Sequence, residues 1–149
     1  MSPPRAPALP PDVFLDTSYI LALVVARDAH HSAARVLSTA LRRAGTRLVT
    51  THAVMFETGN ALARPPYRAI APQALRNLEV DPRTQVLGVT EERYRQARAL
   101  FDARPDQSWG LTDCVSFVVM RELGLTAALT ADHHFEQAGF RALLREPWE

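Results

Sequence analysis

The sequence contains no lysine, so all 17 of its strongly basic residues are arginines, set against 16 aspartates and glutamates. The net charge at pH 7 is only +1. This excludes the strong basic field that many non-specific nucleic-acid-binding proteins carry over their whole surface. Any contact with a nucleic acid must therefore be local, and arginine suits bidentate contacts with phosphate.

Cysteine and long hydrophobic runs are also scarce. Cys114 is the single cysteine, which excludes an internal disulfide, a CxxC redox pair and a zinc site built from thiolates. The apolar run at residues 19–26 is too short to cross a bilayer. The opening residues, MSPPRAPALPPD, contain five prolines and lack the apolar core of a signal peptide. We therefore expect a soluble protein of the reducing cytoplasm.

The sequence does contain enough apolar material for one compact domain. It has 149 residues, of which 47% are hydrophobic and 22% charged, as in ordinary globular proteins. We expect a flexible proline-rich tail at residues 1–11, a single domain at 12–146 and a short tail at 147–149.

Strand-like and helix-like patterns alternate along this domain. Apolar or β-branched runs predict strands at 13–15, 47–50, 84–89, 125–130 and 140–144. Helical spacing predicts helices at 18–26, 31–44, 52–64, 71–79, 91–103, 112–123 and 133–138. Parallel strands need crossover connections, so this alternation predicts an α/β fold with a parallel sheet and helices on both faces. In such sheets, sites lie at the carboxyl ends of the strands.

Two acidic residues follow predicted strands. Asp16 ends the first strand and Asp132 follows the fourth, and either can simply cap the helix that comes next. At the first position, Thr17 or Ser18 can cap the helix equally well, so a cap is not the required role of Asp16.

Two further acids lie on predicted helices. Asp113 opens a long apolar helix, where the helix dipole favours an acid in any protein. Glu57 is the only charged residue between His52 and Arg64, beside an apolar stretch that we expect to face inward. Taken singly, a solvated glutamate is the commoner outcome for such a residue.

Together, these four acids indicate a metal site. Two lie at strand ends, one opens a helix near the same edge, and one points from a neighbouring helix. Unpaired carboxylates gathered in one pocket repel each other and raise their own pKa values, and a divalent cation relieves this. Carboxylate oxygens suit Mg²⁺ and Mn²⁺. Such a site supports attack on a phosphodiester by a metal-activated water.

Four segments resemble, in order, the four motif blocks of the PIN-domain nucleases. They are FLDTSYILAL, MFETGNALAR, WGLTDCVSFVVMRELG and ALTADHHFEQAGF. The similarity covers nearly all of the chain from Val13 onward and is strongest to small prokaryotic members, including VapC-type toxins of toxin–antitoxin pairs. It implies a three-layer α/β/α sandwich with a mostly parallel sheet of about five strands, Mg²⁺ or Mn²⁺ dependence, and RNA cleavage that leaves a 5′-phosphate.

The resemblance also implies roles for single residues and for partners. Asp16, Asp113 and Asp132 would surround the metal, and Asp132 would do so directly or through a water molecule. Glu57 would hold a water bound to the metal or orient the nucleophile. Thr17 and Thr112 would place hydroxyl groups next to these ligands. It further implies a homodimer and a VapB-like antitoxin that masks the site. All four acids of the family are present, which favours an active enzyme.

Two histidines and a tryptophan near these motifs are assigned structural or surface positions. His133 and His134 are interpreted as polar surface, with His134 nearer the phosphate, because neighbouring side chains at a helix start point in different directions. Trp109 is expected to seat its loop on the core rather than to stack on a base.

The alternative function is a non-catalytic or processing PIN-fold module that binds RNA or protein. An aspartate-based phosphotransfer protein ranks last, because Ser18 stands where a second acid would be needed and a receiver domain would need a lysine.

Overall fold

The computed structural model describes residues 1–2 and 8–148. The expected flexible tail at 1–11 and the expected tail at 147–149 therefore lie partly outside the described residues. Within these segments, Leu9 and Trp148 pack against the main core. The domain limits 12–146 remain a prediction.

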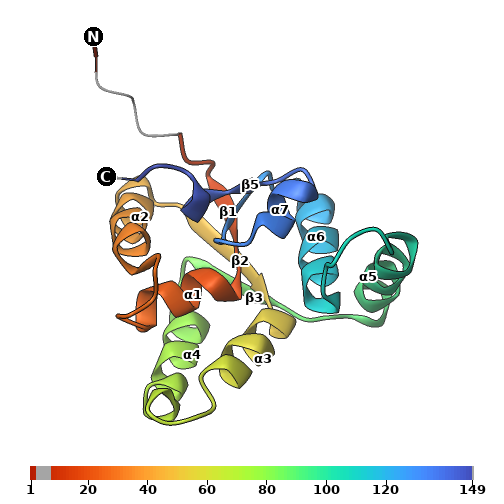
Figure 1. The fold of residues 1–149 in the computed structure, drawn as a ribbon, viewed down its shortest axis with the longest axis horizontal. Coiled ribbons are helices and arrows are strands. Elements are labelled where there is room, and N and C mark those ends of the chain that lie inside the picture. Colours follow the sequence, from red (N-terminus) through yellow and green to blue (C-terminus); the bar gives the residue numbers. More distant parts are fainter. Residues whose placement is uncertain (3–7, 149) are drawn as a thin grey trace.

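A five-stranded, fully parallel sheet in the order β3-β2-β1-β4-β5 forms the centre of the protein (Figure 1). The strands are β1 (Asp12–Leu15), β2 (Arg47–Thr51), β3 (Thr84–Leu87), β4 (Ala127–Leu129) and β5 (Arg141–Ala142). This confirms the predicted α/β class and the predicted parallel sheet of about five strands.

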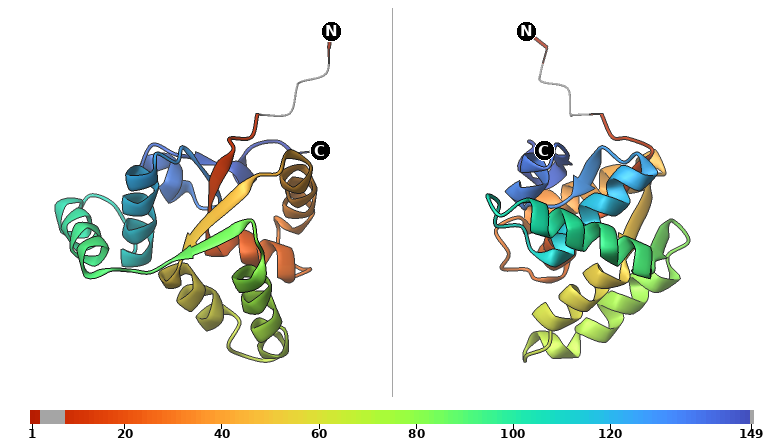
Figure 2. Two further views of the ribbon diagram at one scale, coloured as in Figure 1. Left: turned by 180° about the vertical axis from the view of Figure 1, so that it is seen from behind. Right: turned by 90° about the vertical axis from the view of Figure 1, so that its right-hand side faces the viewer.

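Within residues 1–2 and 8–148, seven α-helices connect and cover the strands. They are α1 (Thr17–Val24), α2 (His31–Ala44), α3 (His52–Ala61), α4 (Ala71–Val80), α5 (Glu91–Ala103), α6 (Leu111–Leu123) and α7 (His133–Gln137), with short 3-10 turns η1 (Tyr67–Ala69) and η2 (Leu143–Arg145). Figure 2 shows α5 and α6 on one side of the sheet and α1 and α2 on the other, while α3 and α4 project together beyond it. No helix of the described residues has the length and apolar character needed to span a membrane.

The central strands are buried on both faces, which explains their continuous apolar sequence. Val13, Phe14 and Leu15 of β1 are at most 1% exposed. Against this sheet, Phe117 of α6 packs edge-on against Phe135 of α7, with ring centroids 5.0 Å apart. These contacts anchor α6 and α7 to the sheet and so fix the positions where both helices begin.

Trp109 seats the loop between α5 and α6 on this core, as the sequence predicts. Its ring is 4% exposed and meets Phe117 edge-on with centroids 5.1 Å apart. Its indole N–H donates to Gln137 Oε1 at 3.1 Å. A buried ring held in this way is not available to stack on a base.

Differences from the predicted elements lie at their ends. The helix expected at 52–64 ends at Ala61, before Pro65 and Pro66. The strand expected at 140–144 pairs only through Arg141 and Ala142, and the chain then turns into η2. There the backbone N–H of Leu144 donates to the Thr130 carbonyl, and this bond lies beyond the paired residues of β5.

Candidate active site

The four predicted acids lie together at the carboxyl edge of the sheet. Asp16 follows β1 and Asp132 follows β4, and these two strands are direct neighbours. Asp113 lies in the first turn of α6, and Glu57 in the middle of α3. Burial is the largest cause of the raised pKa of both Asp16 and Asp113; the charges of Glu57 and Asp113 add to it at Asp16, and those of Asp132 and Glu57 add to it at Asp113. The structure therefore brings all four carboxylates into one electrostatic cluster.

Asp16 is the most buried of the four, with 5% of its surface exposed. Burial raises its pKa from 3.8 to about 6, although hydrogen bonds from Thr130 and Ser18 act in the opposite direction. Its Oδ2 accepts from Thr130 Oγ1 at 2.8 Å and from Ser18 Oγ at 3.0 Å. The same oxygen caps α1 by accepting from the Ser18 backbone N–H at 3.4 Å. Asp16 is thus the helix cap, and neither Thr17 nor Ser18, the alternatives at this position, takes that place.

Asp113 and Asp132 also stabilise the starts of helices. Asp113 Oδ2 accepts from the backbone N–H of Gly110, the residue that precedes α6, at 3.0 Å, and burial raises its pKa. Asp132 Oδ1 accepts from the His134 backbone N–H at 2.9 Å and caps α7. The structural and the catalytic interpretations of these acids are therefore compatible, because each cap uses one oxygen of a carboxylate.

The donor set suits a divalent cation. In the part of the chain that the structure describes, no hydrogen bond reaches Asp16 Oδ1, Asp113 Oδ1 or Asp132 Oδ2. Among the same residues, none of the four acids forms an ion pair with an arginine. Close, partly buried carboxylates without an arginine partner repel one another, and oxygen-preferring cations such as Mg²⁺ or Mn²⁺ compensate that charge. The residues present therefore fit such an ion.

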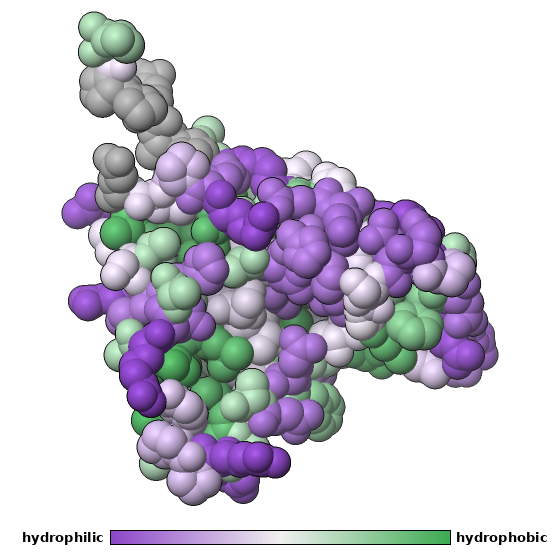
Figure 3. Space-filling view, viewed as in Figure 1, coloured by the Kyte–Doolittle hydropathy of each residue, from purple (hydrophilic) through white to green (hydrophobic). Residues whose placement is uncertain are grey.

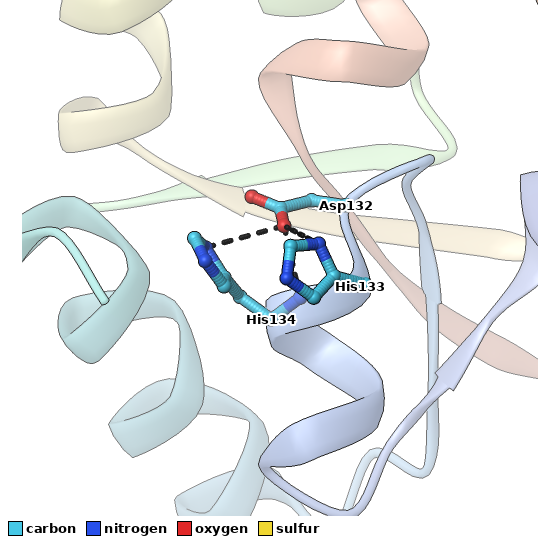
Figure 4. Close-up of side chains that lie close together, drawn as sticks. All are labelled: Asp132, His133 and His134. Carbon is cyan, nitrogen blue, oxygen red and sulfur yellow. Dashed lines mark hydrogen bonds and ion pairs between the residues drawn. The ribbon is translucent and has the colours of Figure 1, made fainter. Parts of the chain in front are cut away.

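Asp132, His133 and His134 form a second close group on α7 and the turn before it (Figure 4). The His133 side chain is 57% exposed and lies 3.7 Å from Asp132 Oδ1 through Nδ1, which fits the interpretation as polar surface. The His134 side chain is only 18% exposed, and its Nδ1 lies 3.2 Å from Asp132 Oδ1 and 3.4 Å from Asp113 Oδ2. The interpretation of His134 as surface was therefore wrong, because α7 turns this ring inward between two carboxylates.

The hydroxyls next to the acids differ from those that the resemblance implied. The Thr17 hydroxyl donates to a backbone carbonyl of α3 at 3.4 Å, and the Thr112 hydroxyl makes no hydrogen bond within the described residues. The hydroxyls that contact Asp16 belong to Ser18 and Thr130. Neither contact was predicted from the sequence. Thr130 does stand at the end of a strand, two residues before a candidate acid, and from there its hydroxyl can hydrogen-bond both to Asp16 after β1 and to the backbone of Asp132 after β4.

Thr130→Val is expected to lower the free energy of unfolding by about 1–3 kcal/mol, because it removes buried hydrogen bonds. Thr130 Oγ1 donates to Asp16 and accepts from the Asp132 backbone N–H at 3.0 Å. Urea unfolding at pH 7 measures this change. Thr126→Val, at an exposed position before β4, is the matched control. Equal stability of the two variants would contradict the expectation.

Comparison with known proteins agrees with this geometry. A sequence model of the PIN domain matches residues 13–141. The 23S rRNA-specific endonuclease VapC20 of Mycobacterium tuberculosis, strains CDC 1551 and H37Rv, is 32% identical over 130 residues, which cover 86% of this chain and 95% of the relative. The crystal structure of Mycobacterium tuberculosis VapC20, described as a sarcin-ricin loop cleaving toxin, superposes with a TM-score of 0.79 at 29% identity, covering 86% of this chain and 95% of that one. The four motif blocks, the five-stranded parallel sheet and these matches together establish that the chain belongs to the PIN-domain family.

Proposed function

We propose that the chain is a metal-dependent endoribonuclease of the VapC type, which hydrolyses RNA phosphodiester bonds. One observation carries this proposal: four carboxylates lie near one edge of the sheet, none of them paired with an arginine in the described part of the chain, and three of them each keep an oxygen free of hydrogen bonds. The relatives named as an rRNA-specific endonuclease and as a toxin support the same activity.

In this proposal Asp16, Asp113 and Asp132 would hold Mg²⁺ or Mn²⁺, and Asp132 would do so directly or through a water molecule. The ion supplies an activated water and neutralises charge on the phosphate. Ser18 and Thr130 fix the Asp16 carboxylate through its other oxygen, so that the free oxygen keeps one direction. Glu57, a partly exposed carboxylate on α3, accepts a hydrogen bond from the attacking water and orients it. The backbone N–H groups of Gly110 and His134 fix the remaining two ligands.

Incubation of the purified chain with bacterial ribosomes and with total RNA tests this function. We expect new 5′-phosphate ends at defined sites in the presence of Mg²⁺ or Mn²⁺ and none with EDTA. The large ribosomal RNA is the first substrate to map, given the relative's specificity. Cleavage that persists in EDTA would refute the metal-dependent mechanism. RNA binding without turnover under either metal would instead indicate the non-catalytic module.

We further propose that the chain forms a homodimer. Phe56 of α3 is 74% exposed, although the sequence predicted an inward position. With Met55 it lines a hollow of about 570 Å³ between α3, α4 and β3. An apolar ring at such a position favours cover by another protein surface, and a second copy of the chain is the proposed occupant.

Phe56→Glu is expected to convert a dimer into a monomer of 16.6 kDa, because it places a charge in the apolar contact. Light scattering coupled to size exclusion measures the mass. Phe101→Glu on α5, at a ring that is 45% exposed, is the matched control and should keep the dimer. A wild type that is already monomeric would refute the dimer.

A VapB-like antitoxin is the second proposed partner, and it would mask the acidic cluster. Apolar side chains gather over α1 and α4 on the face seen in Figure 3, which provides an apolar surface for such a peptide. Co-expression with the product of an adjacent small gene, followed by the RNA-end assay, tests the masking. Cleavage that is unchanged in the co-purified complex would contradict it.

A further inference from the structure

One buried side-chain polar atom in the described part of the chain has no hydrogen-bond partner, and it is Nδ1 of His134. Buried polar atoms usually have partners, so an exception needs an explanation. This nitrogen lies 3.2 Å from Asp132 Oδ1 and 3.4 Å from Asp113 Oδ2. It is thus close to two acceptors at once, without the alignment that a full hydrogen bond to either one requires.

The other ring nitrogen reaches a different segment. Nε2 lies 3.3 Å from the hydroxyl of Ser108, in the loop between α5 and α6. Trp109, the next residue, is held on the core, which keeps the backbone at Ser108 close to the ring. The imidazole therefore connects the α5–α6 loop to carboxylates from the start of α6 and from the turn before α7.

These neighbours determine the proton arrangement of a neutral ring. Ionised carboxylates only accept hydrogen bonds, so the nitrogen between Asp113 and Asp132 carries the hydrogen, whereas a serine hydroxyl can donate to the other nitrogen. A ring with Nδ1–H and an unprotonated Nε2 is thus the arrangement that suits all these neighbours.

We propose that His134 is a positioning residue of the metal site, whose Nδ1–H is shared by Asp113 and Asp132 while Ser108 fixes the ring through Nε2. This inference rests on the proposed function. Two carboxylates that face the same ion repel each other before the ion arrives. A donor between Asp113 Oδ2 and Asp132 Oδ1 offsets this repulsion and holds both groups in place, while their other oxygens remain available to the cation. Such outer partners orient metal ligands, and their loss typically weakens metal binding.

A pair of amide substitutions separates the two ends of the ring. Asparagine places its amide N–H near the position of Nδ1, whereas glutamine reaches towards the position of Nε2. We expect His134→Asn to bind Mn²⁺ within about threefold of the wild type. His134→Gln and His134→Leu, which lack a donor between the carboxylates, should bind about 10–100-fold more weakly. Ser108→Ala should give a smaller loss, of about two- to fivefold.

Calorimetric titration of the full chain with Mn²⁺ at fixed pH, without RNA, measures these affinities independently of catalysis. His133→Gln is the matched control, because this neighbouring ring is 57% exposed, and it should bind as the wild type does. RNA cleavage by His134→Gln should recover to within about fivefold of the wild type at saturating Mn²⁺, since a positioning residue changes the metal requirement more than the maximal rate.

The outcomes separate this inference from the function on which it rests. Wild-type affinity in His134→Gln would overturn the positioning role, as would a loss in His134→Asn as large as in His134→Leu. If the wild type itself binds no Mn²⁺ and Mg²⁺ fails as well, the proposed metal site falls and the role of His134 falls with it. The asparagine and glutamine variants both keep a polar amide at this position, so the contrast between them does not depend on whether the leucine variant folds.

Discussion

Asp113→Asn is expected to lower the rate of RNA cleavage by at least about a thousandfold while preserving the fold. Asparagine keeps the shape of the side chain, and its carbonyl oxygen can still accept the Gly110 N–H that aspartate accepts at 3.0 Å. The start of α6 is therefore maintained. The substitution removes the negative charge that faces the proposed cation. A metal ion that neutralises charge on the phosphate stabilises the transition state by several kcal/mol. Loss of this stabilisation corresponds to a decrease of about a thousandfold in rate.

The measurement is the initial rate of cleavage of one mapped RNA site at saturating Mg²⁺. Asp102→Asn is the control, because this aspartate of α5 is 57% exposed, pairs with Arg98 and lies outside the acidic cluster. Its rate should equal that of the wild type. If Asp113→Asn keeps more than a tenth of wild-type activity with an unchanged thermal unfolding midpoint, Asp113 does not hold an essential ion.

The fold was predictable where burial dominates the sequence. The apolar run of β1 and the helical spacing of α2 and α5 predicted those elements closely, because elements packed against the sheet need a continuous or periodic apolar pattern. Prediction was weaker at the edge of the sheet. The paired part of β5 is only two residues long, and the chain then turns into η2, where Leu144 donates to the Thr130 carbonyl; no local sequence pattern records this long-range contact.

The candidate site was predictable at the level of its acids and less so at the level of their partners. Asp16 and Asp132 could be placed together because parallel strands bring their carboxyl ends to one edge. The contacts of Thr130 and His134 depend instead on the direction of side chains after a strand and at a helix start. Two adjacent histidines have the same sequence signal, yet only His134 turns inward. Such a choice is made by tertiary packing, here by the position of α7 against Phe117.

In the proposed function, the three aspartates combine two roles that place different demands on the carboxylate. As caps they need only an acceptor oxygen, which a neutral asparagine also offers. As proposed metal ligands they must be ionised while buried and close to other acids, which costs folding free energy. The raised pKa of Asp16, about 6 instead of 3.8, is a direct expression of that cost.

Asp16→Asn is therefore expected to stabilise the metal-free protein at pH 7.5 while abolishing its stabilisation by metal. A carboxyl whose pKa is raised on folding binds its proton more tightly in the folded state. The free energy of unfolding therefore falls as pH rises from about 4 to about 6, the interval between the unfolded and folded pKa values. Above this interval the ionised, buried Asp16 costs about 3 kcal/mol. Asparagine avoids this cost and can still accept a hydrogen bond from Thr130. The free energy of unfolding of Asp16→Asn should therefore exceed that of the wild type by at most about 3 kcal/mol at pH 7.5, and the difference should disappear near pH 4.

Urea unfolding in EDTA at pH 7.5 and pH 4 measures both ends of this interval, and repetition with Mn²⁺ at pH 7.5 measures the metal effect. The wild type should gain stability from Mn²⁺, because a ligand that binds only the folded state stabilises it in proportion to its affinity. The variant should gain little, because it lacks the most buried ligand of the proposed site.

A variant that is less stable than the wild type at pH 7.5, or one whose advantage is the same at both pH values, would show that ionised Asp16 does not carry this cost. A variant that is stabilised by Mn²⁺ as much as the wild type would place the ion elsewhere. If Asp16→Asn is more stable than the wild type without metal and is no longer stabilised by Mn²⁺, the ionised carboxylate of Asp16 lowers the stability of the metal-free protein and is required for binding the cation.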